Sequence, residues 1–152
     1  MKGAVIAFEP NPHVFKVLEA NAKLNPQFTR IIPLNFAATP EDGTFTFGSG
    51  DAAFANGGIV GFSSNKASNN RYTFEVTGRN IQTYLRNNYA SILPKLRLVK
   101  TDAEGYDKEI LKSISGLLAT YKPAVISECF RELKKSERIE LYQTLAYIGY
   151  KI

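Results

Sequence analysis

LVKTDAEGY, residues 98–106, is the stretch of sequence that decides the fold. An apolar run ends there in two carboxylates, Asp102 and Glu104, and a glycine. An amphipathic pattern follows at once, with apolar side chains at positions 106, 110, 111, 114, 117 and 118. These features predict a buried strand, a tight turn and a helix over residues 106–118. Ligands of open parallel sheets bind at the carboxyl ends of the strands, where Asp102 and Glu104 are expected.

The same order of strand, acid and helix occurs twice more, ending in Glu9 and in Glu128. Strands are predicted at residues 4–8, 31–36, 97–101 and 124–127. Further helices are predicted at residues 12–25, 81–89 and 137–148. This alternation predicts an α/β fold, with the four strands parallel in one sheet and helices on both faces. The run at 4–8 is typical of a strand covered on both sides. Glu9, Asp102 and Glu128 are then expected along one rim of the sheet.

The middle of the chain interrupts this alternation. Residues 44–47 and 71–76 alternate polar and apolar side chains, which predicts antiparallel strands. The stretch between them, residues 48–70, is rich in Gly, Ser, Ala and Asn, and it is either a loop over a site or only a long connection. In the helix at 137–148 the candidate buried positions include Ile139, Leu141, Tyr142 and Leu145. Residues 150–152 resemble the opening of another strand.

Composition favours one ordinary globular domain in 152 residues, with 44% apolar and 22% charged residues. No run is long enough to span a membrane and no signal peptide is evident, so no membrane partner is expected. The single cysteine, Cys129, cannot form an internal disulfide, which favours a reducing compartment and a cytoplasmic location. The net charge is +5, but the basic residues are scattered. One basic cluster, at Arg131, Lys134, Lys135 and Arg138, is expected to be a solvated helix start, so a nucleic-acid partner is not favoured.

Spacing alone leaves the chemistry of the acids open. Glu9 could accept hydrogen bonds from the hydroxyls of a ribose, or it could be an acid stabilised by the next helix dipole. Asp102 and Glu104 could bind a metal, orient a substrate hydroxyl, take its proton, or cap a helix. Glu128 is similarly placed and more ambiguous. No Gly-x-Gly-x-x-Gly loop and no Cys/His pattern for zinc occurs in the sequence, and no metal is expected.

An ordered set of motifs resembles the FkbM family of methyltransferases. The first is FEPNP at residues 8–12, with Phe15, Leu18, Asn21 and Asn25 spaced behind it. The others are NFA at 35–37 followed by Gly43, KTDAEG at 100–105, and KP at 122–123 leading to Glu128. Each motif is weak by itself, but together they run in the family's order over nearly the whole chain.

The resemblance implies a Rossmann-like domain that uses S-adenosylmethionine and usually methylates an oxygen, here of a small-molecule or sugar acceptor. It assigns Glu9 to the cofactor's ribose, with Pro10 and Asn11 beside it. It assigns Asn35, Phe36 and Ala37 to the border of the adenine. Asp102 and Glu104 would face the transferring methyl group and the acceptor, and are the expected catalytic residues.

The sequence also departs from the family. The family's first strand, which ends in an Asp-x-Gly-Ala-Asn type loop, has no counterpart, and neither do its last strands. We therefore interpret residues 1–152 as a partial methyltransferase domain, from the second strand to the start of the sixth. The missing first strand belongs between the strands at 4–8 and 97–101. The chain alone is expected to be a poor methyltransferase or none, completed by another segment or by a homo-oligomer. The alternative is a non-catalytic remnant that binds a partner through an open sheet edge.

Overall fold

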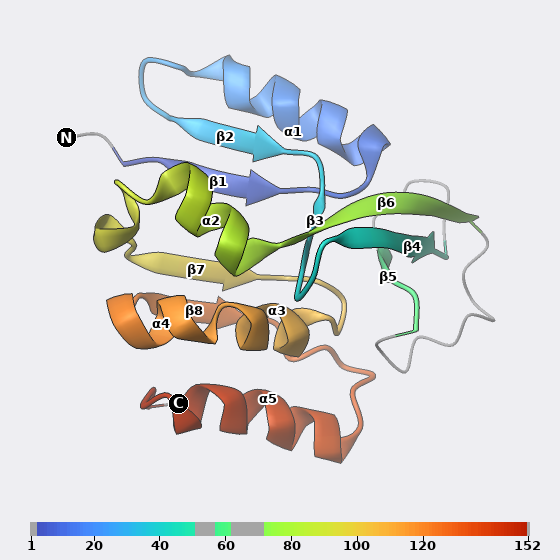
Figure 1. Ribbon diagram of the computed structural model, residues 1–152. Coiled ribbons are helices and arrows are strands. Elements are labelled where there is room, and N and C mark those ends of the chain that lie inside the picture. Colours follow the sequence, from blue (N-terminus) through green and yellow to red (C-terminus); the bar gives the residue numbers. More distant parts are fainter. Residues whose placement is uncertain (1–2, 51–56, 62–71, 152) are drawn as a thin grey trace.

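The computed structural model describes residues 3–50, 57–61 and 72–151 of the chain (Figure 1). Its strands are β1 (Val5–Phe8), β2 (Ile31–Leu34), β3 (Ala37–Thr39), β4 (Gly43–Ser49), β5 (Gly57–Ile59), β6 (Tyr72–Asn80), β7 (Leu98–Thr101) and β8 (Ala124–Ser127). Its helices are α1 (Pro12–Leu24), α2 (Ile81–Tyr89), the 3₁₀ turn η2 (Leu93–Lys95), α3 (Asp107–Ser113), α4 (Ser115–Tyr121) and α5 (Lys135–Tyr147). The prediction of a mixed α/β fold is confirmed.

The four predicted parallel strands form two separate pairs. β1 pairs in parallel with β2, with Val5 opposite Ile31, and β7 pairs in parallel with β8, with Leu98 opposite Ala124. The prediction of one four-stranded sheet is therefore wrong, because β1 and β7 belong to different sheets. Figure 1 shows β1 and β7 facing one another with the same direction. A sheet needs backbone groups within hydrogen-bond reach, and β1 and β7 make no ladder with each other.

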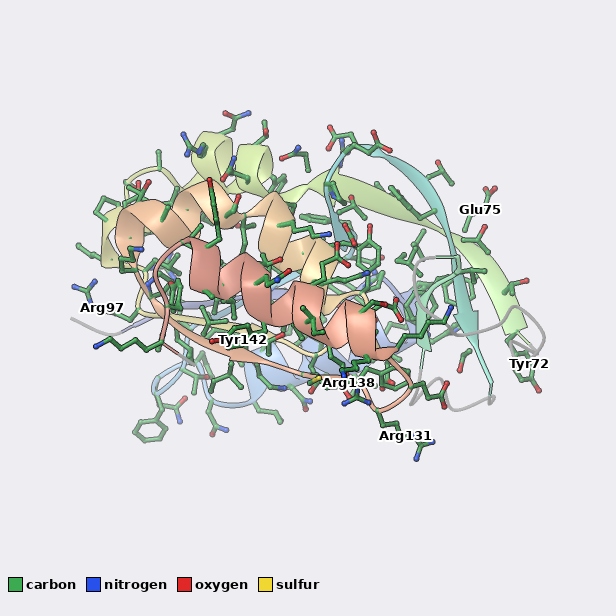
Figure 2. All side chains as sticks on the ribbon, turned by 90° about the horizontal axis from the view of Figure 1, so that it is seen from below. Tyr72, Glu75, Arg97, Arg131, Arg138 and Tyr142 are labelled. Carbon is green, nitrogen blue, oxygen red and sulfur yellow. The ribbon has the colours of Figure 1, made fainter. Side chains whose placement is uncertain are left out.

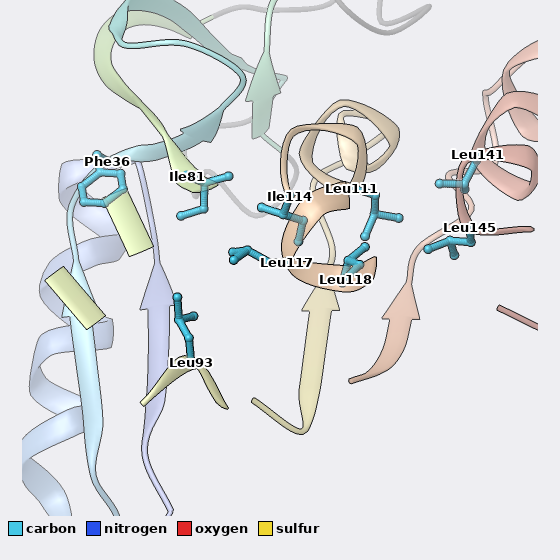
Figure 3. Close-up of a cluster of buried hydrophobic side chains, with 9 residues drawn as sticks. All are labelled: Phe36, Ile81, Leu93, Leu111, Ile114, Leu117, Leu118, Leu141 and Leu145. Atoms are coloured by element: carbon cyan, nitrogen blue, oxygen red, sulfur yellow. The ribbon is translucent and has the colours of Figure 1, made fainter. Parts of the chain in front are cut away.

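Side chains hold the two pairs together where the backbone does not. Leu111, Leu117 and Leu118 are at most 1% exposed and lie at the centre of the main core (Figure 3). The other buried members of this core are Phe36, Ile81, Leu93, Ile114, Leu141 and Leu145. Phe8 and Leu34 of the first pair pack against it, and so do Val99 and Val125 of the second pair. One hydrophobic core thus orients both pairs with their carboxyl ends on the same side.

A third sheet, which is mixed, follows β2 in the chain and has the order β3-β6-β4-β5. β4 and β6 are antiparallel, with Phe45 opposite Val76, which confirms the prediction from the alternating segments. β3 is parallel to β6, and β5 is antiparallel to β4. This sheet has its own small core, made of Ala37, Phe47, Ile59, Val76 and Tyr106. Much of the stretch 48–70 lies outside the described residues, so its role as a loop over a site stays a prediction.

The predicted helix at 106–118 is two helices, α3 and α4, which meet at Ile114. The hydroxyl of Ser113 donates a hydrogen bond to the carbonyl of Ile110 at 2.7 Å, and Ser115 and Gly116 follow. Serine side chains that bond the preceding turn, and glycine, both weaken a helix, which accounts for the break.

The structure also corrects several predicted burials. Leu141 and Leu145 of α5 are buried as predicted, but Ile139 is 46% and Tyr142 53% exposed. Figure 2 shows Tyr142 on the outer surface of α5. Val5 is also exposed, so β1 is not covered on both faces along its length. The described residues after α5 form no strand, and the Tyr150 hydroxyl instead donates a hydrogen bond to the carbonyl of Pro123 at 2.8 Å.

Candidate active site

The ends of β7 and β8 are tied together directly before their acids. The Thr101 hydroxyl donates a hydrogen bond to the Ser127 hydroxyl at 2.9 Å, and Thr101 is buried. The Glu128 N–H donates to the Thr101 carbonyl at 3.1 Å and extends the ladder by one residue. Asp102 and Glu128 therefore leave neighbouring strand ends, as the sequence predicted for acids on parallel strands.

The turn after β7 has an unusual backbone. Glu104 has a φ of 50° and Gly105 a φ of 95°, so two successive residues adopt left-handed conformations. Glycine accepts this conformation freely, whereas a glutamate does so at a cost in free energy. Asp102 is more exposed, and its carboxylate accepts a hydrogen bond from the Lys100 ammonium at 2.8 Å. The turn thus presents two carboxylates in different environments.

The acids of this region influence each other's protonation. The pKa of Glu104 is raised by burial first, and then by the negative charges of Glu128, Asp102 and Asp107. The pKa of Glu128 is raised by burial and by the charges of Asp107 and Asp102. A carboxyl with a raised pKa holds a proton closer to neutral pH and can exchange it with a bound substrate. The four acids form one electrostatic group, which we call the acidic rim.

Glu9 lies at the end of β1 in a second group, formed with Asn35. The carboxylate of Glu9 accepts the Asn11 N–H through Oε1 at 2.8 Å. Burial raises the pKa of Glu9, and that backbone hydrogen bond partly opposes the rise. The Asn35 amide donates to the carbonyls of Glu9 at 2.8 Å and Pro10 at 3.3 Å. Asn35 therefore ties the end of β2 to the loop after β1.

The other predicted cofactor residues have structural partners. Asn11 is 1% exposed, and its Oδ1 accepts the N–H groups of His13 and Val14, so it caps α1. Phe36 is buried, with its ring centre 4.7 Å from that of Tyr84. Ala37 is buried in β3. Cofactor roles for these residues stay predictions, and for Asn11 the side-chain oxygen is already engaged.

Comparison with known protein families decides the assignment. The family described as the methyltransferase FkbM domain matches residues 1–152. The chain belongs to this family. No curated protein and no solved structure matches the chain. The resemblance seen in the sequence motifs is confirmed, and membership supports a methyltransferase.

In this FkbM domain the two groups of predicted site residues lie apart. Glu9 and Asn35 follow the strands of the β1-β2 pair, whereas Asp102, Glu104 and Glu128 follow the strands of the β7-β8 pair. The structure thus brings Asp102, Glu104 and Glu128 together and keeps Glu9 with Asn35 on the other strand pair. An open hollow of about 690 Å³ lies elsewhere, beside α5, and none of the predicted site residues lines it.

Sequence reasoning missed Asp107, the first residue of α3 and a member of the acidic rim. Asp107 is 1% exposed, and its Oδ2 accepts the N–H groups of Ala103 and Gly105. Its position five residues after Asp102, at a predicted helix start, was the available clue. Within the part of the chain that the structure describes, no group of three or more His, Cys, Asp or Glu residues could hold a metal ion.

Proposed function

We propose that this FkbM domain transfers a methyl group from S-adenosylmethionine to an oxygen of a small-molecule or sugar acceptor. The observation that carries the proposal is the acidic rim after β7 and β8 in a chain of a methyltransferase family. We further propose that the two parallel pairs are the halves of a Rossmann-like sheet, since they share a direction and a core.

The residues near Glu9 fit the ribose of the cofactor. Glu9 is half-buried at a strand's carboxyl end, and Oε1 is engaged by the Asn11 N–H. None of the described residues bonds the second oxygen, which could therefore accept a ligand hydroxyl, the contact that such sites make. Asn35 holds the backbone that directly follows this carboxylate, through the carbonyls of Glu9 and Pro10, which restrains the carboxylate before a ligand binds. Pro10, Asn11, Phe36 and Ala37 would border the rest of the nucleoside.

The acidic rim would act on the acceptor. The cofactor supplies an electrophilic methyl group on a sulfonium, so alignment of the acceptor oxygen carries much of the catalysis. Asp102 is exposed and paired with Lys100, which suits it to hold an acceptor hydroxyl. Glu104 has the raised pKa expected of a group that takes the acceptor's proton.

Calorimetry with S-adenosylhomocysteine, on a complete version of the domain in which the edges of β1 and β7 are paired, tests the cofactor assignment. Replacing Glu9→Gln should weaken binding by about tenfold or more, because a charge-assisted hydrogen bond is lost. Glu19→Gln is the matched control, since Glu19 is a half-exposed acid of α1 that pairs with Lys23. Equal affinities for the wild type and the Glu9 variant would remove the ribose assignment.

Methyl transfer tests the acceptor assignment. Asp102→Asn should slow turnover at saturating cofactor more than it weakens cofactor binding. An equal loss of affinity with turnover intact would move Asp102 to the cofactor site.

The facing edges of β1 and β7 support a second proposal, on partners. Val5 donates its N–H to Arg30 and Glu9 donates to Leu34, so alternate residues of β1 face β2. In a parallel ladder the residues between them, Ile6 and Phe8, direct their backbone groups the other way. The same alternation in β7 leaves Leu98 and Lys100 with backbone groups turned from β8. We propose that an extended segment, from another part of the polypeptide or a second copy, pairs with both edges.

Until that segment pairs, cofactor binding by these 152 residues is expected to be weak, since two sheet edges next to the site lack their ladder. Residue-resolved hydrogen exchange tests this. The amides of Ile6, Phe8, Leu98 and Lys100 should exchange quickly in dilute protein, whereas Val5 and Glu9 are protected. Slowing of the four amides with rising concentration would indicate a homo-oligomer. Equal protection of both sets in dilute monomer would contradict the proposal.

Two further points concern location and nucleic acid. None of the described helices is long and apolar enough to cross a membrane. A cytoplasmic location is our proposal, and it is supported by the single cysteine in the sequence.

Figure 2 shows Arg97 at one end of the molecule and Arg131 with Arg138 well away from it, by the start of α5. This dispersal favours a small-molecule acceptor over nucleic acid.

A further inference from the structure

Asp107 belongs to the acidic rim, but the chemistry proposed above gives its buried carboxylate no individual role, and that carboxylate contacts the turn that carries Glu104. Its Oδ2 accepts the Ala103 N–H at 3.2 Å and the Gly105 N–H at 3.3 Å. The two donors stand on either side of Glu104. Asp107 therefore holds the backbone directly before and after the candidate proton acceptor.

The turn needs such a restraint because of its conformation. Glu104 and Gly105 are both left-handed, and for glutamate this conformation costs free energy unless its surroundings impose it. β5 also passes close to Glu104, since a Cβ added to Gly58 would lie 3.6 Å from the Glu104 Cβ. Glu104 is thus enclosed by α3 through Asp107 on one side and approached by β5 on another.

Helix capping alone does not explain Asp107. An acid in the first turn of a helix is stabilised even at the surface, whereas Asp107 is 1% exposed. Its Oδ1 is buried and has no hydrogen-bond partner among the residues that the structure describes. It also lies close enough to Glu104 and Glu128 for its charge to disfavour their ionisation. Burying a carboxylate beside other acids costs free energy. The hydrogen bonds from the turn to Asp107 are the interactions that offset this cost.

We propose that Asp107 is a positioning residue, which locks the Ala103–Gly105 turn so that Glu104 is fixed at the acidic rim. The proposal depends on the proposed function only for the consequence, which is the placing of Glu104 against the acceptor. The restraint itself is a property of the folded chain and is measurable without substrate.

Amide hydrogen exchange by NMR tests the restraint. In Asp107→Asn the amides of Ala103 and Gly105 should exchange about tenfold faster, because charged acceptors are replaced by a neutral one. Asp107→Ala should show a larger effect, and if it fails to fold the asparagine variant still decides. Glu109→Gln is the matched control. Glu109 lies in the same helical turn, but its carboxylate pairs with Lys108 and Lys112 and not with the loop. It should leave both amides unchanged.

A glycine at position 104 provides a rescue. Glycine adopts the left-handed conformation without cost, so in a Glu104→Gly background the Asp107→Asn change should accelerate exchange much less. A simple loss of stability would instead accelerate exchange equally in both backgrounds and throughout α3. Unchanged amides in Asp107→Asn, an equal response to Glu109→Gln, or no rescue by glycine would each overturn the proposal.

Kinetics separate this inference from the proposed function. In active protein, Asp107→Asn should lower kcat for methyl transfer and leave the KM for S-adenosylmethionine within about twofold, because the proposed cofactor contacts lie near Glu9. A KM effect without a kcat effect would overturn the positioning role. If the wild type neither binds nor uses the cofactor, the proposed function fails, and the exchange data alone decide the role of Asp107.

Discussion

The ion pairs between α3 and α5 give a prediction whose size follows from the structure. Lys108 of α3 is 9% exposed, and its ammonium lies 2.8 Å from the Glu140 carboxylate of α5. Lys112 bonds the other oxygen of the same carboxylate. The two lysines lower the pKa of Glu140 from 4.5 to about 2, chiefly through these hydrogen bonds. Because α3 also carries Asp107 of the acidic rim, these ion pairs with α5 help to hold that helix in place.

Replacing Glu140→Gln should therefore destabilise the fold. The fall in pKa corresponds to about 3.4 kcal/mol if each pKa unit is worth about 1.36 kcal/mol. Since 43% of the Glu140 side chain is exposed, solvent screening reduces the expected loss to about 1–2 kcal/mol. Lys108 keeps Glu137 at 3.6 Å and Glu109 at 3.9 Å, so its charge is not left alone.

Urea unfolding at several pH values measures the effect. A carboxyl whose pKa is lowered by folding contributes stability above about pH 4.5, and this contribution is lost as the pH falls towards 2. The wild type should exceed Glu140→Gln by about 1–2 kcal/mol at pH 7, and the difference should shrink below pH 4.5. Glu19→Gln, which removes a half-exposed pair on α1, should cost less than about 0.5 kcal/mol. An equal cost for both variants, or a difference independent of pH, would refute the reasoning.

Two further predictions concern the core and the rim. Leu117→Ala should lower the free energy of unfolding by about 3–5 kcal/mol, since Leu117 is 1% exposed in the core shared by both strand pairs. A loss below about 1 kcal/mol would show that this core does not join the two pairs. Glu104 should titrate above 4.5 in carbon-13 NMR, because burial and the neighbouring acids raise its pKa. Its contribution to the free energy of unfolding is therefore lost as the pH rises from 4.5 through this pKa. Glu104→Gln should accordingly stabilise the fold at pH 7. A midpoint at or below 4.5 would contradict this.

The sequence by itself determined the local structure and the family. Apolar runs, three of which end in an acid, predicted the four strands and their parallel direction within each pair, and alternation predicted the β4–β6 pairing. The helix predicted from residue 12 begins there as α1, because a cap such as Asn11 and a proline at the first position act only on adjacent residues. The ordered motifs identified the FkbM family for the same reason, since each is a short contiguous stretch.

The tertiary structure decided what depends on distant segments. Ile139 and Tyr142 have the periodicity of buried residues and Val5 lies in an apolar run, yet all three are exposed, because a pattern indicates a face and only packing partners bury it. The separation of β1 from β7 has the same origin, since strand pairing is settled by which backbone edges meet. Asp107 became visible only when its carboxylate was seen to close on Ala103 and Gly105. That contact depends on a backbone turn with positive φ at Glu104, which sequence patterns do not predict for a glutamate.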